Sequence, residues 1–242
     1  MSNIRQAFQN GKAFIPFITC GDPDLESTKR NVRAAVAAGA DLVELGIPFS
    51  DPTAEGPVIQ AANLRALSGG VTTDAVFQMV AELREELTTP LVFMTYANVV
   101  FSYGIARFAA RAAEVGIDGI ILPDVPFEEK EEFAPAFRAV GIDFISMIAP
   151  TSMARIREIA AAAEGFLYVV SSLGVTGVRQ EINTDLSGML ASVRQANPSL
   201  PAAIGFGIST PAQAKRMAAV ADGVIVGSAI VRIMAEKGRE AD

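Results

Sequence analysis

Residues 41–57 read DLVELGIPFSDPTAEGP, a stretch that begins as an apolar β-strand and ends as a proline-rich loop. Strand alternation places Glu44 on the same face as Leu42 and Gly46. Burying a carboxylate there is costly unless the group is paired or has a task. A second acid, Glu55, follows in the loop, so the two carboxylates could form an acid–base pair. The spacing is equally compatible with a structural alternative, in which Glu44 pairs with an arginine and Glu55 is solvated.

The composition is that of a globular chain with a sizeable core. The chain has 242 residues, 50% of them hydrophobic, and a mean hydropathy of +0.34. This length fits one α/β barrel or two small domains. The net charge of −7 and the isoelectric point near 4.8 argue against nucleic acid or an anionic membrane as a partner. We expect neither a signal peptide nor a membrane span, because no apolar run is long enough.

The residue types that are rare or missing restrict the chemistry. There is no histidine, the commonest general base and a frequent metal ligand, and we predict no metal site. Cys20 is the single cysteine, so we expect a small buried side chain, no internal disulfide and a reducing cytoplasm. Lysines occur only at positions 12, 29, 130, 215 and 237. Proton transfer must therefore fall mainly to carboxylates, with tyrosine as an auxiliary.

One pattern repeats along the chain: an apolar, β-rich run, then a loop, then a helical stretch. The expected strands cover Ala13–Thr19, Asp41–Ile47, Pro90–Tyr96, Asp118–Val125, Asp143–Ala149, Phe166–Ser172, Ala202–Ile208 and Gly223–Ser228. Helices are expected near 24–38, 73–87, 104–115, 127–140, 152–164, 186–196, 211–221 and 229–237. The pattern also predicts a short opening helix at 2–10 and an extra helix around Val58–Leu67, inside the long connection after the second strand.

Eight strands that alternate with helices predict an α/β fold, a parallel eight-stranded (β/α)8 TIM barrel. The alternative is an open, doubly wound sheet. It is disfavoured because the first strand–helix turn, Thr19–Pro23, lacks a G-x-G-x-x-G pattern. No linker or composition shift divides the chain, so we expect a single domain over residues 1–242. Barrel active sites lie at the carboxyl ends of the strands, which is where Glu44 and its long loop are expected.

Smaller signals mark the ends of helices. Asp22-Pro23 and Thr210-Pro211 each predict an N-cap followed by proline at the first helical position. Asp124 is expected at the end of the fourth strand. A structural role for it, in a helix cap or a loop, is at least as compatible with this position as a role in the site.

Glycine-rich turns follow the last three strands, at Gly174–Gly177, Gly205–Ile208 and Gly227-Ser228. Each glycine alone is weak evidence, since glycine is common at such turns. Together they would bring backbone N–H groups, a hydroxyl and a helix N-terminus to one side of the barrel mouth. That arrangement is how these barrels bind a phosphate, so we predict a phosphate site there.

A third group of residues is apolar and expected near the strand ends: Phe17, Ile59, Tyr96, Ile121, Met147, Tyr168 and Phe206. Barrel core is the alternative role, above all for Ile121 and Met147. A pocket with a phosphate at one end, carboxylates in the middle and apolar side chains at the other would suit a flat aromatic group attached to a phosphorylated chain.

Four segments together resemble the tryptophan synthase α subunit family: FITCGDP at 17–23, ELGIPFSDP at 44–52, GVTG at 174–177 and GFGIS at 205–209. The resemblance runs essentially end to end and in the same order. It implies a TIM barrel without a cofactor of its own, paired in an α2β2 tetramer with a β subunit that carries pyridoxal phosphate. It also implies a lyase that cleaves indole-3-glycerol phosphate to indole and D-glyceraldehyde 3-phosphate.

The resemblance also assigns roles to residues. Glu44 matches the family's catalytic proton shuttle, and Glu55 its second carboxylate. Gly177, Gly207, Gly227 and Ser228 match phosphate-binding positions, and Phe17, Ile59, Tyr96, Tyr168 and Phe206 match pocket positions. Thr176 matches the threonine of a mobile loop, and Asp51 and Pro52 lie in the loop that contacts the β subunit. The sequence departs from the family once, because Glu55 stands where aspartate is usual.

Other functions remain as alternatives at this point. A Schiff-base aldolase would need a lysine at a strand end, and a metal-dependent aldolase would favour histidine ligands; the expected strands offer neither. An indole-3-glycerol phosphate synthase would also want a barrel lysine, whereas a sugar-phosphate isomerase stays open. The non-enzymatic alternative is a weakly catalytic or inactive chain whose task is to activate a β subunit.

Overall fold

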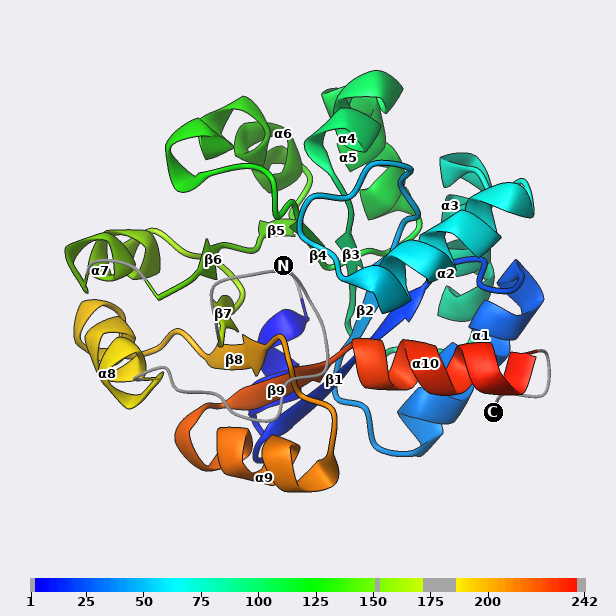
Figure 1. Ribbon diagram of the computed structural model, residues 1–242. Coiled ribbons are helices and arrows are strands. Elements are labelled where there is room, and N and C mark those ends of the chain that lie inside the picture. Colours follow the sequence, from blue (N-terminus) through cyan, green and yellow to red (C-terminus); the bar gives the residue numbers. More distant parts are fainter. Residues whose placement is uncertain (1–2, 151–152, 172–185, 239–242) are drawn as a thin grey trace.

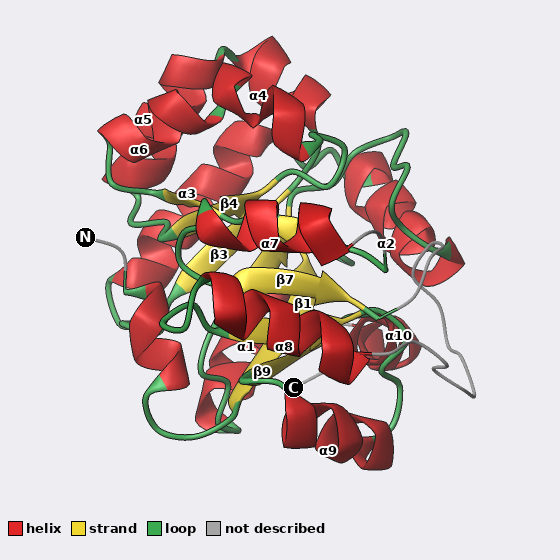
Figure 2. Ribbon diagram, turned by 90° about the vertical axis from the view of Figure 1, so that its left-hand side faces the viewer, coloured by secondary structure: helices red, strands yellow, loops and turns green. Residues whose placement is uncertain are grey.

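The fold is a curled sheet of parallel strands surrounded by helices (Figures 1 and 2). The computed structural model describes residues 3–150, 153–171 and 186–238. In sheet order the strands are β5 (Asp143–Phe144), β4 (Gly119–Ile121), β3 (Leu91–Met94), β2 (Val43–Gly46), β1 (Ala13–Thr19), β9 (Gly223–Val226), β8 (Ala202–Gly205), β7 (Leu167–Val170) and β6 (Met147–Ile148).

The strands at the two ends of this order, β5 and β6, are consecutive pieces of one expected strand. Phe144 pairs with Ile120 of β4, whereas Met147 pairs with Tyr168 of β7. Two hydrogen bonds continue the ladders through the break, from Ile145 N to the Ile120 carbonyl and from Tyr168 N to the Ser146 carbonyl. The predicted TIM barrel is therefore confirmed. The prediction of one unbroken strand over 143–149 is wrong, because each half serves a different neighbour.

Helices follow the strands as expected, with α1 (Leu25–Ala37), α3 (Thr73–Arg84), α5 (Ile105–Glu114), α6 (Ala134–Ala139), α7 (Met153–Ala161), α8 (Leu186–Ala196), α9 (Pro211–Val220) and α10 (Ser228–Lys237). The opening helix is a 3-10 helix, η1 (Ile4–Phe8), and a second one, η2 (Phe127–Glu132), precedes α6. The extra helix after the second strand is α2 (Pro57–Ser68). Sequence reasoning missed α4 (Ala97–Tyr103).

The barrel separates an inner and an outer apolar layer, as strand alternation requires. Leu42 packs inside with Ile15, Val92 and Ile121, so Ile121 is a core residue. Val43, Leu45 and Ile47 point outward and pack against the surrounding helices. This parity puts Glu44 inside the barrel.

Two helix-start predictions have different outcomes. Thr210 caps α9 as expected, and its hydroxyl accepts from Gln213 N at 3.2 Å. The N-cap of α1 is Asp24, not Asp22, since Asp24 accepts from Ser27 N at 2.7 Å. Asp22 is buried and binds Arg65 of α2 through both carboxylate oxygens, at 2.7 and 2.8 Å.

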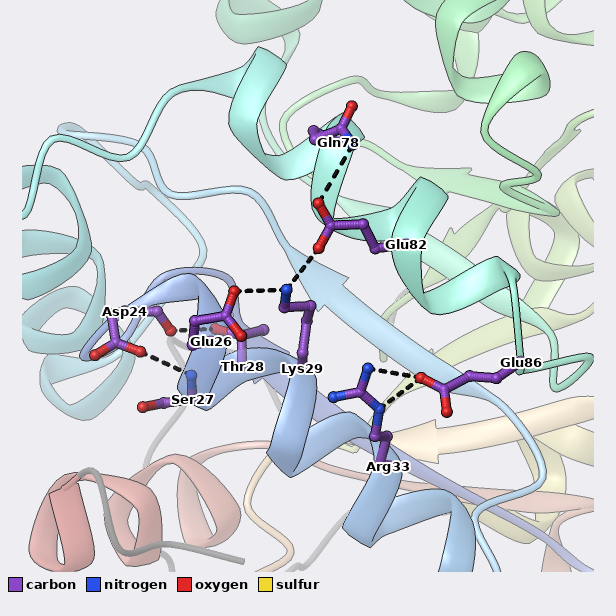
Figure 3. A network of polar contacts seen from close by, with 9 residues as sticks. All are labelled: Asp24, Glu26, Ser27, Thr28, Lys29, Arg33, Gln78, Glu82 and Glu86. Carbon is purple, nitrogen blue, oxygen red and sulfur yellow. Dashed lines mark hydrogen bonds and ion pairs between the residues drawn. The ribbon is translucent and has the colours of Figure 1, made fainter.

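Charged side chains link α1 to α3 on the outer surface (Figure 3). Lys29 contacts Glu26 at 2.6 Å and Glu82 at 2.5 Å, and Arg33 contacts Glu86 at 2.6 Å. The two carboxylates raise the pKa of Lys29. These contacts join the two outer helices.

Helix α10 starts at the carboxyl end of β9 and runs outward beside α2 (Figure 1). Its N-terminus therefore points into the region where Glu44 and the loop of Glu55 are found. Within the described ranges no helix is long and apolar enough to cross a membrane, and no cluster of three potential metal ligands occurs.

Candidate active site

Glu44 lies inside the barrel on β2, in register with Phe17 of β1 and Val92 of β3. Its side chain is 1% exposed, and neither carboxylate oxygen has a hydrogen-bond partner in the part of the chain that the structure describes. The structural alternative, an ion pair between Glu44 and an arginine, is therefore contradicted. A buried carboxyl without partners costs free energy, which indicates a task other than stability.

Burial is also what sets the protonation state of Glu44. Desolvation penalises its charged form most, and the nearby negative charge of Glu55 adds to this, so that the pKa of Glu44 is raised to about 8. The neutral acid therefore predominates at pH 7. Glu44 is able to donate a proton from inside an apolar chamber.

Glu55 stands directly before α2, whose N-cap is Gly56. Its side chain is only 5% exposed, so the alternative of a solvated loop glutamate is wrong. Asn63 lies further along α2, and its Nδ2 donates to Glu55 Oε2 at 2.6 Å. Burial raises the pKa of Glu55 to about 7, while hydrogen bonds from Asn63 and Tyr96 lower it.

The surroundings of the two carboxyls thus separate their roles. Among residues 3–150, 153–171 and 186–238, Glu44 has no donor that would stabilise its anion, whereas Glu55 has two. Glu44 has the higher pKa of the two, so Glu55 ionises first while Glu44 keeps its proton. A neutral acid beside a fixed anion is the arrangement that acid–base catalysis requires.

The loop after β8 forms another side of the cavity. Phe206 and Gly207 both have left-handed backbone angles, with φ of 71° and 76°. For Phe206 this conformation is unfavourable. It is held by Ser171 Oγ, which donates to the Phe206 carbonyl at 2.6 Å, and by an edge-to-face contact of the Phe206 ring with Tyr168.

Gln213 of α9 fixes the end of the same loop. Its side-chain oxygen accepts from Ser209 N at 2.8 Å and from Ser209 Oγ at 2.9 Å. On the next strand, Gly227 and Ser228 begin α10 and line the same cavity. Loop N–H groups and the N-terminus of a ten-residue helix are a favourable place for a phosphate.

One cavity brings most of the predicted residues together. It is lined by Phe17, Glu44, Glu55, Ile59, Met94, Tyr168, Phe206, Gly207, Ile208, Ser209, Ile225, Gly227 and Ser228. Tyr96 is not part of this lining: it stacks on Phe49, and its hydroxyl accepts from Ala54 N at 3.2 Å, so it supports the loop that carries Glu55. Thr176 and Gly177 lie outside the described residues.

Other predicted residues lie further out. Asp51 is exposed and Pro52 is half-buried, on the loop between β2 and Glu55. The Ser50 hydroxyl contacts the Asp51 carboxylate. Asp124 caps α4, because both its oxygens accept from Ala97 N, at 3.0 and 3.1 Å. Cys20 is fully buried, and burial raises the pKa of its thiol.

Sequence reasoning missed three supporting residues: Asn63, Ser171 and Gln213. Gln213 carries a recognisable signal, since Thr210-x-x-Gln213 is a capping box. Asn63 carries a weaker one, because it lies four positions after Ile59 and so on the same face of α2. Ser171 carries none, since its contact with Phe206 depends on which strands are neighbours.

A closed parallel (β/α)8 barrel with two buried carboxylates and glycine-containing loops at the carboxyl ends of its strands defines the class of TIM-barrel enzymes. Comparison with known proteins narrows this class. A family model described as tryptophan synthase alpha chain matches residues 2–242. The chain belongs to the tryptophan synthase alpha chain family.

Relatives and solved structures agree with this family. The alpha chain of Lacticaseibacillus casei is 51% identical over 241 residues, covering 100% of this chain and 90% of the relative. The alpha chain of Lactiplantibacillus plantarum is 53% identical over 236 residues, covering 97% of this chain and 89% of the relative. The Legionella pneumophila alpha chain structure has a TM-score of 0.84 at 38% identity, covering 98% of this chain and 89% of the other. The structure of the tryptophan synthase complex of Pyrococcus furiosus has a TM-score of 0.82 at 37% identity, covering 95% of this chain and 92% of the other.

Proposed function

We propose that this chain is the lyase of a tryptophan synthase and cleaves indole-3-glycerol phosphate to indole and D-glyceraldehyde 3-phosphate. The observation that carries the proposal is the shared cavity, where an unpaired buried Glu44 and a hydrogen-bonded Glu55 face the loop of Gly207 and the start of α10. This retro-aldol reaction needs an acid, an anion and a site for the phosphate. Glu44 is the acid, Glu55 is the anion, and the backbone N–H groups at the Gly207 loop and the start of α10 form the phosphate site.

In the proposed mechanism, Glu44 acts twice. Its neutral carboxyl gives a proton to C3 of the indole ring, which places a positive charge on the ring nitrogen. The Glu55 carboxylate, fixed by Asn63, stabilises that charge at the indole N–H. The Glu44 carboxylate then takes the proton of the side-chain hydroxyl while the C–C bond breaks, so that its proton is restored and indole and the aldehyde leave.

The remaining residues bind the substrate in this proposal. The N–H groups of Gly207, Gly227 and Ser228, with the α10 N-terminus, hold the phosphate. Phe17, Ile59, Tyr168 and Phe206 enclose the indole ring. Tyr96 holds Glu55 in place. By their match to the family, Gly177 is a further phosphate-binding residue and Thr176 is the threonine that helps to order the closed state.

A β subunit is the proposed partner, as in the α2β2 complex of Pyrococcus furiosus named in a structural neighbour. This chain then needs no cofactor of its own, and pyridoxal phosphate belongs to the partner. Asp51 and Pro52, on the exposed loop that leads to Glu55, are proposed to contact that partner. A single-domain barrel in the cytoplasm fits this assembly.

A direct assay tests the function. The purified chain is incubated with indole-3-glycerol phosphate, with and without a tryptophan synthase β subunit, and glyceraldehyde 3-phosphate is measured through a coupled dehydrogenase. We expect cleavage by the chain alone and a faster rate with β. A chain that accelerates the β reaction but releases no aldehyde would support the inactive-activator alternative and refute the proposal.

A further inference from the structure

A second cavity lies outside the barrel wall, where the fifth strand is broken. Its volume is about 210 Å³. It is lined by Leu122, Pro123, Val125, Pro126, Phe127, Lys130, Phe144, Ile145, Ser146, Met147, Ala149, Arg155 and Ile159. These residues come from the end of β4, from η2, from the β5–β6 break and from α7 (Figure 1). None of them lines the cavity of Glu44, so the two spaces are distinct.

Lys130 is the unusual residue of this cavity. It is 8% exposed, and among the described residues its ammonium group forms no ion pair or hydrogen bond. Its ammonium group lies 4.2 Å from the centre of the Phe127 ring, which is a cation–π contact. Lys29 is a contrasting case in the same protein, because its largely buried ammonium group is paired with two carboxylates within 2.6 Å. Desolvation lowers the pKa of Lys130, the nearby Arg138 lowers it further, and Glu131 and Glu164 only partly oppose this.

Among the described residues no carboxylate contacts the ammonium directly, although Glu131 and Glu164 attract it from a greater distance. No acidic residue lines the cavity. Glu131 and Glu164 are both ion-paired to Arg138, at 3.3 and 2.5 Å. Arg155, the other cation of the lining, is held by both oxygens of Glu128. A cavity with a positive charge and no negative one, in a chain of net charge −7, favours an anionic ligand.

The lining also restricts what the anion carries. Phe127, Phe144 and Ile159 make the cavity mostly apolar, and Ser146 adds one buried hydroxyl. Drug-sized ligands occupy pockets of about 300–1,000 Å³, so a smaller cavity suits a single ring. Free phosphate would find few donors among these side chains. We propose that this cavity binds a small aromatic carboxylate, with the carboxylate on the ammonium of Lys130 and the ring among the apolar side chains.

Benzoate is the probe, and its binding to the whole chain is measured by calorimetry and by thermal unfolding. Indole and inorganic phosphate are present at saturation, so that the cavity of Glu44 is filled. We expect a saturable dissociation constant of about 1 mM or tighter and a raised melting temperature. The uncharged analogue benzamide should bind at least about tenfold more weakly, since it lacks the charge.

Lys130→Met keeps an apolar stem of similar length and removes the charge, and Lys130→Gln is the second variant should the first not fold. Benzoate binding should be lost in both and kept in Lys215→Met, because Lys215 is exposed and lies outside the cavity. Equal binding by wild type and Lys130→Met, no saturation up to about 10 mM, or Lys130-dependent binding of phosphate in place of benzoate would each overturn the proposal. The readout is binding, so it is independent of lyase activity.

Discussion

At the residue scale, Glu44 and Glu55 occupy one cavity but differ in what surrounds them. Glu44 is fully buried and has no donor among the described residues, so its proton is retained near neutral pH. Glu55 accepts from Asn63, so its negative charge is supported. Two acids of the same type thus become one donor and one anion through their neighbours alone.

Glu44→Gln tests the proton donor. The amide keeps the shape of the side chain and removes the proton, so we expect a folded protein that still binds substrate. Its kcat should fall by about 10³-fold or more, because general acid–base catalysis is lost in both steps. Rates in a single-turnover experiment separate chemistry from product release. A variant that kept a tenth of the wild-type rate would exclude Glu44 as the shuttle.

Asn63→Ala tests how the anion is held. The Asn63 amide lowers the pKa of Glu55, so its removal should raise that pKa further above about 7. The acidic limb of the pH profile of kcat/KM should then move to higher pH, with about a tenfold loss at pH 7. Gln60→Ala is the matched control, because Gln60 donates at 2.7 Å to the main-chain oxygen of Glu55 and not to its carboxylate. If the acidic limb of the kcat/KM profile stayed at the same pH in Asn63→Ala, the Asn63 amide would have only a structural role.

Gly227→Ala separates the fold from the phosphate site. A Cβ at Gly227 would lie 3.6 Å from Phe17 and 3.7 Å from Ile59, which is ordinary contact, so stability should change by less than about 0.5 kcal/mol. The added methyl group would narrow the cavity beside the N–H groups of Gly227 and Ser228 that are proposed to hold the phosphate, and glyceraldehyde 3-phosphate should bind about tenfold more weakly or worse. Gly46→Ala is the contrast, since its Cβ would meet the Phe17 ring at 2.5 Å and destabilise the fold. Normal phosphate affinity in Gly227→Ala would place the phosphate elsewhere.

At the element scale, local signals decide where helices begin. Thr210 and Gln213 form a capping box that the sequence pattern contains, and the structure uses it. Asp22 shows where a local pattern fails. The chain offers Asp22 and Asp24 two positions apart, and Asp22 is taken by Arg65 of α2, a partner 43 positions away. Short elements such as α4 are missed for the same reason: Asp124, which caps it, comes from the next strand–helix loop.

The capping box of α9 also holds the loop that lines the cavity. Thr210→Ala should cost about 1 kcal/mol of unfolding free energy, and it should raise KM for the phosphorylated substrate several-fold by loosening Ser209. Thr72→Ala is the matched control. Thr72 caps α3 through a hydrogen bond of the same length, 3.2 Å, and lines no part of the cavity. We expect equal loss of stability in the two variants and a changed KM in Thr210→Ala alone.

At the scale of the whole molecule, the sequence could predict the barrel because every unit repeats the same order of strand, loop and helix. It could also place the site at one end of the barrel, since parallel strands share a carboxyl edge. The distances between site residues could not be predicted. Ser171 reaches Phe206 only because β7 pairs with β8, and the two cavities depend on packing between elements far apart in sequence.

The raised pKa values of the carboxyl pair make the stability of the whole molecule depend on pH. A carboxyl whose pKa is higher in the folded than in the unfolded state binds more protons when folded. The unfolding free energy therefore falls as pH rises from about 4.5 towards about 8, by at most about 1.4 kcal/mol per pH unit for each group. Surface acids paired with cations act in the opposite sense, as for Glu82, whose pKa Lys29 lowers.

Comparison of wild type with Glu44→Gln cancels those surface contributions. Glutamine cannot ionise, so the variant should be more stable than wild type at pH 8 and should lose much of that advantage at pH 5, where Glu44 is neutral in wild type as well. Urea unfolding at pH 5, 6.5 and 8 measures the difference, and Glu132→Gln, an exposed position, should leave the pH dependence unchanged. A stability difference that stays constant across this range would mean that Glu44 is ionised in the folded protein, and the acid would then have to be sought elsewhere in the cavity.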